Sequence, residues 1–197
     1  MNPITTVRVR LAGYGGYGVV TASRILGLMF TQNNFHVLQT ESHGAAARGG
    51  ACTADLTISS DPIYELEFSR PDVLIVLSTP AFKKCCSISP DLSSDLLLLE
   101  AEIIDNSAVQ LGLADLPNAH DMKIYQAHIR KIAEELGHVR FMGIASLGAL
   151  AAVDTRFSMQ ELERTIKRDA KLRRFEKANL QALQLGVTAT KTLTPKT

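Results

Sequence analysis

The feature that most constrains this chain is a glycine-rich stretch, Gly13-Tyr14-Gly15-Gly16-Tyr17-Gly18, which directly follows an apolar run. Residues 7–12 alternate at period two and predict a strand, whereas residues 19–30 place apolar side chains at helical spacing. A strand that meets a tight glycine turn and continues at once into a helix is typical of nucleotide-binding α/β units. We therefore expect a Rossmann-like domain.

The remaining sequence supports an α/β fold, with further strands that alternate with helical segments. Together, residues 7–12, 19–30 and 35–40 predict one βαβ unit, which favours a parallel sheet and a right-handed crossover. Further strands are expected at 51–58, 72–77, 96–100 and 123–127, and helices at 78–86, 129–136, 141–153, 158–168 and 171–185. The last helix should end at Gly186, before a loose tail. We predict one three-layer domain over residues 1–197, with a mostly parallel sheet and a helical C-terminal segment.

Charge and composition argue against several classes of binding partner and location for this protein. The 21 basic and 20 acidic residues leave a formal charge of +1, which favours neither nucleic acid nor an anionic membrane. We expect no membrane span and no secretory signal, because no apolar run approaches the ~18 residues of a span and the N-terminus lacks a basic stretch before an apolar core. A cytoplasmic protein is expected. Cys52, Cys85 and Cys86 include no C-x-x-C pair, so we predict free buried thiols and no metal site.

The glycine turn predicts a contact with a phosphate or carboxylate. Its glycines allow a tight turn, close approach of the backbone to the ligand, and close packing of strand and helix. The helix N-terminus adds unpaired N–H groups. The predicted ligand residues are Gly13, Gly15, Gly16 and Gly18. Glu41, after the second strand, could hold a ribose in a dinucleotide-binding domain. The alternative is that the glycines serve packing alone.

A second loop, residues 42–50, is rich in small residues and carries one arginine. Arg48 could grip a phosphate or carboxylate with two hydrogen bonds, and a surface salt bridge or subunit contact is the alternative. His43, Gly44 and Gly49 complete the candidate ligand set. We predict no catalytic residue, because Ser23 and Ser146 lie in helical segments without the G-x-S-x-G elbow of a hydrolase.

A basic stretch lies near the C-terminus of the chain. Most such stretches are solvated helix faces, and the alternative is contact with an acidic partner subunit or a phosphate-rich ligand. Its members are Lys171, Arg173, Arg174 and Lys177.

The two glycine motifs at this spacing resemble those of the γ subunit of 2-oxoacid:ferredoxin oxidoreductases. The second motif reads Ser42-His43-Gly44-Ala45-Ala46-Ala47-Arg48-Gly49-Gly50-Ala51-Cys52. Residues 70–77, 142–151 and 175–182 are also similar to that family, and the loop is nearest to its 2-oxoglutarate branch. The family usually has Gln where Tyr17 stands and Tyr where His43 stands.

The resemblance implies a subunit that is active only within a heteromeric enzyme. Such an enzyme oxidatively decarboxylates a 2-oxoacid, makes an acyl-CoA and passes electrons to ferredoxin. Thiamine diphosphate, Mg²⁺ and iron–sulfur clusters would lie on partner subunits, and this chain would support assembly and contact coenzyme A. Two alternatives are a free NAD(P)- or flavin-dependent oxidoreductase and a non-catalytic assembly protein.

Overall fold

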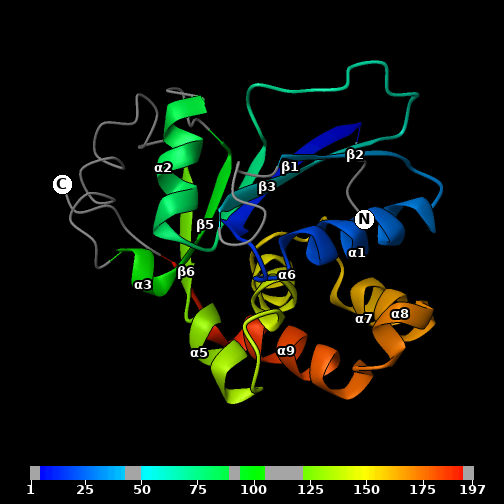
Figure 1. Ribbon diagram of the computed structural model, residues 1–197. Coiled ribbons are helices and arrows are strands. Elements are labelled where there is room, and N and C mark those ends of the chain that lie inside the picture. Colours follow the sequence, from blue (N-terminus) through cyan, green and yellow to red (C-terminus); the bar gives the residue numbers. More distant parts are fainter. Residues whose placement is uncertain (1–4, 43–49, 89–93, 105–121, 193–197) are drawn as a thin grey trace.

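The computed structural model describes residues 5–42, 50–88, 94–104 and 122–192 (Figure 1). Its strands are β1 Thr6–Tyr14, β2 His36–Ser42, β3 Ala51–Ser59, β4 Val73–Val76, β5 Leu96–Glu100, β6 Lys123–Ala127 and β7 Thr190–Thr192. Its helices are α1 Val19–Thr31, α2 Thr79–Ile88, α3 Ala101–Ile104, α5 Ile129–Glu135, α6 Phe141–Val153, α7 Met159–Arg168, α8 Ala170–Arg173 and α9 Glu176–Ala189. The predicted α/β class is confirmed.

The strands form one seven-stranded sheet in the order β2-β3-β1-β4-β5-β6-β7. Strands β1, β4, β5 and β6 pair in parallel, whereas β3 pairs antiparallel with both β1 and β2, and β7 pairs antiparallel with β6. Five strands therefore share one direction, which agrees with a mostly parallel sheet.

The predicted βαβ unit at the N-terminus is present as β1, α1 and β2, but its two strands are not neighbours in the sheet. Strand β2 runs parallel to β1, but β3 is inserted between them and hydrogen-bonds to both. The alternation of apolar side chains predicts a strand without defining its neighbour, so nothing in the sequence indicated this insertion. The insertion moves the end of β2 one strand further from the glycine turn.

Helices cover both faces of the sheet, which gives the predicted three layers (Figure 1). In β4, Val73 and Ile75 face the side that α1, α6, α7 and α9 cover, whereas Leu74 and Val76 face α2. This is the all-apolar pattern expected of a parallel strand that is buried on both faces. Residues 141–150 of α6 are all buried, in agreement with the predicted buried helix.

The C-terminal region departs from its prediction. The expected helix over 171–185 is broken between α8 and α9, and α9 continues past Gly186 to Ala189. The chain then pairs with β6 as β7, where a loose tail was expected. A Cβ atom on Gly186 would overlap the carbonyl oxygen of Ala145 on α6, so this glycine allows two helices to touch and does not end one.

Candidate functional site

The glycine turn lies between β1 and α1, but its glycines have different roles. Strand β1 continues through Gly13 and Tyr14, which pair with Cys52 and Ala51 of β3. A Cβ atom on Gly13 would lie 2.6 Å from Cγ2 of Val19, so Gly13 permits close contact between the strand and α1. The backbone reverses only after Tyr14, where the Tyr17 amide donates to the Tyr14 carbonyl over 3.0 Å.

Gly18 holds the turn against α6. It caps α1 with a φ of +79°, and a Cβ atom there would overlap the carbonyl oxygen of Arg140. The Gly143 amide donates to the Tyr17 carbonyl over 2.8 Å, which closes this side of the turn with backbone. Gly16 differs, because its φ is +95° and a Cβ atom there would meet none of the described residues within 4 Å. Packing therefore accounts for Gly13 and Gly18, whereas Gly16 is open to a ligand.

The two glycine motifs meet in space. The Gly15 amide donates to the Gly50 carbonyl over 3.1 Å, so the end of the second motif is tied to the turn. Arg48 lies two residues before Gly50 in the sequence. The other predicted ligand residues of this loop lie, like Arg48, outside the described residues: His43, Gly44 and Gly49.

Glu41 is not placed as a dinucleotide-binding domain would require. It lies opposite Ala54 of β3, and β3 separates it from β1, so two strand spacings of about 5 Å intervene. Glu41 lines a surface depression near β1 and β3, together with Arg10 and Asp55. The ribose-binding interpretation of Glu41 depended on β2 lying next to β1, and the sheet order removes that support.

A cleft of about 280 Å³ opens at the carboxyl ends of β1, β4 and β5. From β1 the chain crosses to the β2–β3 side of the sheet, and from β4 it crosses to the β5 side, so the two strands flank a topological switch point. Ligands of open α/β sheets bind at this position. The lining residues are Tyr14, Tyr17, Leu77, Ser78, Thr79, Pro80, Glu100, Glu102 and Arg130.

Side chains along one wall of the cleft form a hydrogen-bonded network. Arg130 donates from Nη2 to the Tyr17 hydroxyl over 2.8 Å and pairs through Nε with Glu102 over 2.8 Å. Its guanidinium also lies 5.3 Å from the centre of the Tyr17 ring. Glu100 accepts a hydrogen bond of 2.9 Å from the Glu102 amide, and the Arg130 amide approaches it at 3.5 Å. The network connects the glycine turn to β5 and α5.

The surroundings of Glu100 strongly shift the pKa of its carboxyl. Only 1% of it is exposed, and burial raises the pKa of its carboxyl to about 7, with the neighbouring Glu102 carboxylate adding to the rise. Near neutral pH this carboxyl can therefore either accept or donate a proton at the cleft wall. A strongly perturbed carboxyl in a cleft is a candidate functional group.

The cleft network was missed from the sequence, although one signal was present. Ser78 and Glu100 are polar residues that directly follow the apolar runs of two neighbouring parallel strands. Such positions meet at one edge of a parallel sheet. Ser78 accepts a hydrogen bond of 3.3 Å from the Ala81 amide and caps α2. Arg130 carried no comparable signal, because α5 brings it to the cleft from a distant part of the chain.

The remaining sequence candidates lie in the core. Ser23 and Ser146 are fully buried, and Ser146 donates to the Gly143 carbonyl over 2.7 Å, whereas the Ser23 hydroxyl has no hydrogen-bond partner among the described residues. Cys52 and Cys85 are buried thiols, as predicted. In the described part of the chain, no three metal-ligating side chains gather as an ion would require. None of the described helices is long and apolar enough to cross a membrane.

Together, the sheet order, the turn and the cleft define a Rossmann-like α/β domain with a cleft at its switch point. The profile of the family named Pyruvate ferredoxin/flavodoxin oxidoreductase matches residues 8–189, so the chain belongs to this family. The predicted family resemblance is confirmed.

Two curated relatives match almost the whole chain. The 2-oxoglutarate synthase subunit KorC of Methanothermobacter thermautotrophicus is 31% identical, over 90% of this chain and 92% of its own. The subunit of the same name from Methanocaldococcus jannaschii is 30% identical, over 94% of each chain.

Solved structures share the fold. A keto/oxoacid ferredoxin oxidoreductase gamma subunit from Geobacter sulfurreducens superposes with a TM-score of 0.72 at 22% identity, covering 95% of this chain and all of that one. A 2-oxoglutarate:ferredoxin oxidoreductase from Magnetococcus marinus, solved with 2-oxoglutarate, coenzyme A and succinyl-CoA bound, superposes with a TM-score of 0.73 at 15% identity. It covers 98% of this chain, which corresponds to 32% of the larger one.

Proposed function

We propose that this chain, as a single domain over residues 1–197, is the γ subunit of a cytoplasmic 2-oxoglutarate:ferredoxin oxidoreductase. The observation that carries the proposal is identity of 31% and 30% to two 2-oxoglutarate synthase subunits along nine-tenths of the chain. The complex oxidatively decarboxylates its 2-oxoacid, forms an acyl-CoA and reduces ferredoxin. Thiamine diphosphate, Mg²⁺ and iron–sulfur clusters belong to its other subunits and supply the decarboxylation and electron transfer.

Within the complex, this chain supports assembly and contacts the phosphate-bearing end of coenzyme A. The contact falls on the open part of the turn, Gly15 and Gly16, and on the loop that carries Arg48. Two observations support it: no described residue obstructs Gly16, and the hydrogen bond from Gly15 to Gly50 brings the end of that loop to the turn. A phosphate at a helix N-terminus is a common arrangement.

The complex can be recovered with a tagged copy of this chain expressed in its native cell. We expect thiamine-binding and iron–sulfur subunits to co-purify, together with dye reduction that requires both coenzyme A and a 2-oxoacid. Activity should be highest with 2-oxoglutarate, compared with pyruvate, 2-oxoisovalerate and indolepyruvate. The chain alone should be inactive. A solitary chain whose melting temperature rises with NAD(P) or flavin would instead support a free oxidoreductase.

The substitution Arg48→Ala tests the coenzyme contact. In the assembled complex we expect KM for coenzyme A to rise about tenfold or more, because a charge-assisted pair to a phosphate would be lost. KM for the 2-oxoacid should stay unchanged, and steady-state kinetics measures both. Lys83→Ala, at an exposed position of α2, is the matched control for loss of a surface cation. Unchanged kinetics in an intact Arg48→Ala complex would favour a glycine motif that serves assembly alone.

A further inference from the structure

A second pocket, lined by basic and aromatic side chains, lies between α1, α6, α8 and α9. Its volume is about 270 Å³, and it shares no residue with the switch-point cleft. Thr21, Phe141 and Ile144 also line it, and none of the described lining residues is acidic. The rest of the lining consists of Arg24, Arg140, Lys171, Leu172, Phe175 and Asn179. The basic stretch recognised in the sequence thus contributes Lys171 to the wall of this pocket.

Arg140 is held in place by aromatic rings, but a buried nitrogen of its side chain has no partner. Its guanidinium carbon lies 4.0 Å from the centre of the Phe175 ring and 5.3 Å from that of Phe141. Its Nε is buried, yet among the described residues nothing accepts a hydrogen bond from it. Such an unpaired donor costs free energy until an acceptor arrives. The missing acceptor points to a ligand.

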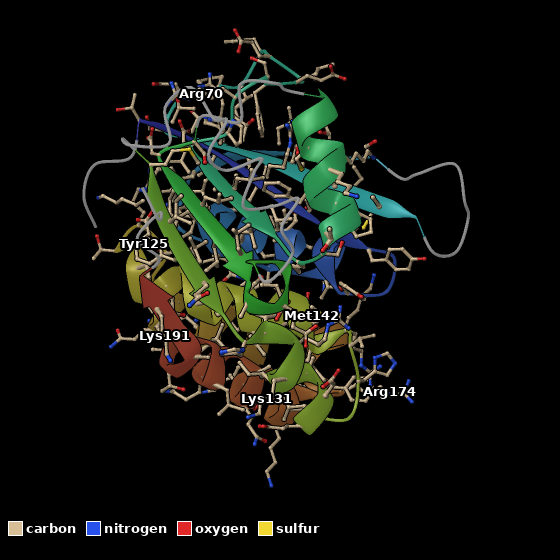
Figure 2. All side chains as sticks on the ribbon, turned by 90° about the vertical axis from the view of Figure 1, so that its left-hand side faces the viewer. Arg70, Tyr125, Lys131, Met142, Arg174 and Lys191 are labelled. Atoms are coloured by element: carbon tan, nitrogen blue, oxygen red, sulfur yellow. The ribbon has the colours of Figure 1, made fainter. Side chains whose placement is uncertain are left out.

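The other cations differ in how they are paired. Arg24 donates to both carboxylate oxygens of Asp169, over 2.8 and 3.2 Å, and this pairing lowers the pKa of Asp169. Within the described chain, Lys171 forms no ion pair with its ammonium group. Arg174 lies 5.4 Å from the Phe175 ring centre and sits at the periphery of the molecule, in contrast to the interior Met142 (Figure 2). The pocket therefore carries an excess of positive charge.

We propose that this pocket receives an acidic side chain from another subunit of the oxidoreductase complex. A guanidinium stacked on a ring leaves its N–H edge free, and that edge matches the two oxygens of a carboxylate. Phe175, 36% exposed, supplies an apolar contact beside the ion pair. Arginine and aromatic residues dominate binding energy in protein interfaces. Because Arg140 covers a face of the Phe175 ring, the site suits a carboxylate better than a stacked nucleobase.

The inference rests on the proposed function, which supplies the partner. It assigns an interaction surface on α6, α8 and α9, separate from the coenzyme contact at the turn. The remaining subunits, purified without this chain, provide the binding partner. The affinity of the wild-type chain and of single variants for them can be measured by biolayer interferometry, between about 0.05 and 0.3 M NaCl.

The decisive variant is Lys171→Glu, which places a negative charge at the pocket. We expect it to weaken binding at least about tenfold and to reduce the salt dependence. Arg140→Lys keeps the charge and loses the planar stack, so it should weaken binding by a smaller factor. Lys177→Glu is the matched control, because it changes the same charge in the same basic stretch but does not line the pocket. It should alter affinity less than about threefold. Circular dichroism establishes that each variant is folded.

The outcomes distinguish failure of the proposed function from failure of the docking role of the pocket. Failure of the wild-type chain to bind the subunits would overturn the proposed function and this inference with it. Wild-type binding that Lys171→Glu leaves intact, or that Lys177→Glu weakens equally, would overturn the pocket alone. Isothermal titration with inorganic phosphate adds a further arm: phosphate binding that Lys171→Glu abolishes, with subunit affinity unchanged, would assign the pocket to a small anion and reject the docking role.

Discussion

Replacing Gly148 by Ala is expected to lower the free energy of unfolding by about 3 kcal/mol, which corresponds to a fall in melting temperature of about 10 °C. Gly148 lies in α6 where this helix contacts α9, and a Cβ atom there would overlap the carbonyl oxygen of Leu183. The obstruction is backbone, so relief requires the two helices to separate. Urea unfolding and thermal denaturation, followed by circular dichroism, measure the effect.

Gly27→Ala is the matched control, because Gly27 also lies inside a helix. A Cβ atom at Gly27 would meet Val37 at 3.4 Å and Leu56 at 3.5 Å, which is ordinary packing. Alanine favours the helix over glycine, so this variant should be as stable as the wild type or more so, by up to about 1 kcal/mol. Equal stabilities of the Gly148 and Gly27 variants would contradict the close contact between α6 and α9. The effect concerns function too, because the start of α6 holds Gly18 and Tyr17.

Glu100→Gln is expected to remove a large pH dependence of stability. Burial raises the pKa of Glu100 to about 7 in the folded chain, from an ordinary value of 4.5. Between these values the folded state binds more protons than the unfolded state, so the free energy of unfolding decreases as pH rises. This group contributes its full stabilisation below pH 4.5 and loses it as pH rises through about 7. The loss amounts to about 3 kcal/mol.

The measurement is the difference in unfolding free energy between the wild type and Glu100→Gln from about pH 4 to pH 8. Subtraction cancels the titration of other groups. The free energy of unfolding of the variant should therefore rise relative to that of the wild type by about 3 kcal/mol across this range. Glu102→Gln gives a second test, because the Glu102 carboxylate adds to the rise in the pKa of Glu100. In that background the difference should shrink. A difference that does not vary with pH would show that Glu100 does not titrate in this range.

Much of the fold was predictable because local patterns define individual elements. The helix expected over 19–30 is α1, and the apolar helix over 141–153 is α6 with the same bounds. Side chains that recur at the period of a helix or strand carry this information within a short window. The predictions failed where a residue's role depends on a contact with a distant part of the chain. Gly186 was predicted to end a helix, but in the structure it leaves room for the carbonyl of Ala145 on α6.

The candidate site was predictable in part. The glycine turn and the second motif were recognised from their residues, and the bond from Gly15 to Gly50 brings them together. Glu100, Arg130 and Tyr17 were missed as a group, since they come from β5, α5 and the turn and meet only in the folded chain. The basic stretch was recognised, whereas its pocket depends on Arg140, which precedes it by some 30 residues.

The sequence by itself determined the fold class, most of the elements, the glycine turn and the family, because each depends on residues close together in the chain or on whole motifs. Only the tertiary structure decided the place of β3 beside β1, the pairing of β7, and the division of the turn into packing glycines and one open glycine. It also decided the raised pKa of Glu100. These properties depend on contacts and desolvation between distant segments, which local periodicity does not encode.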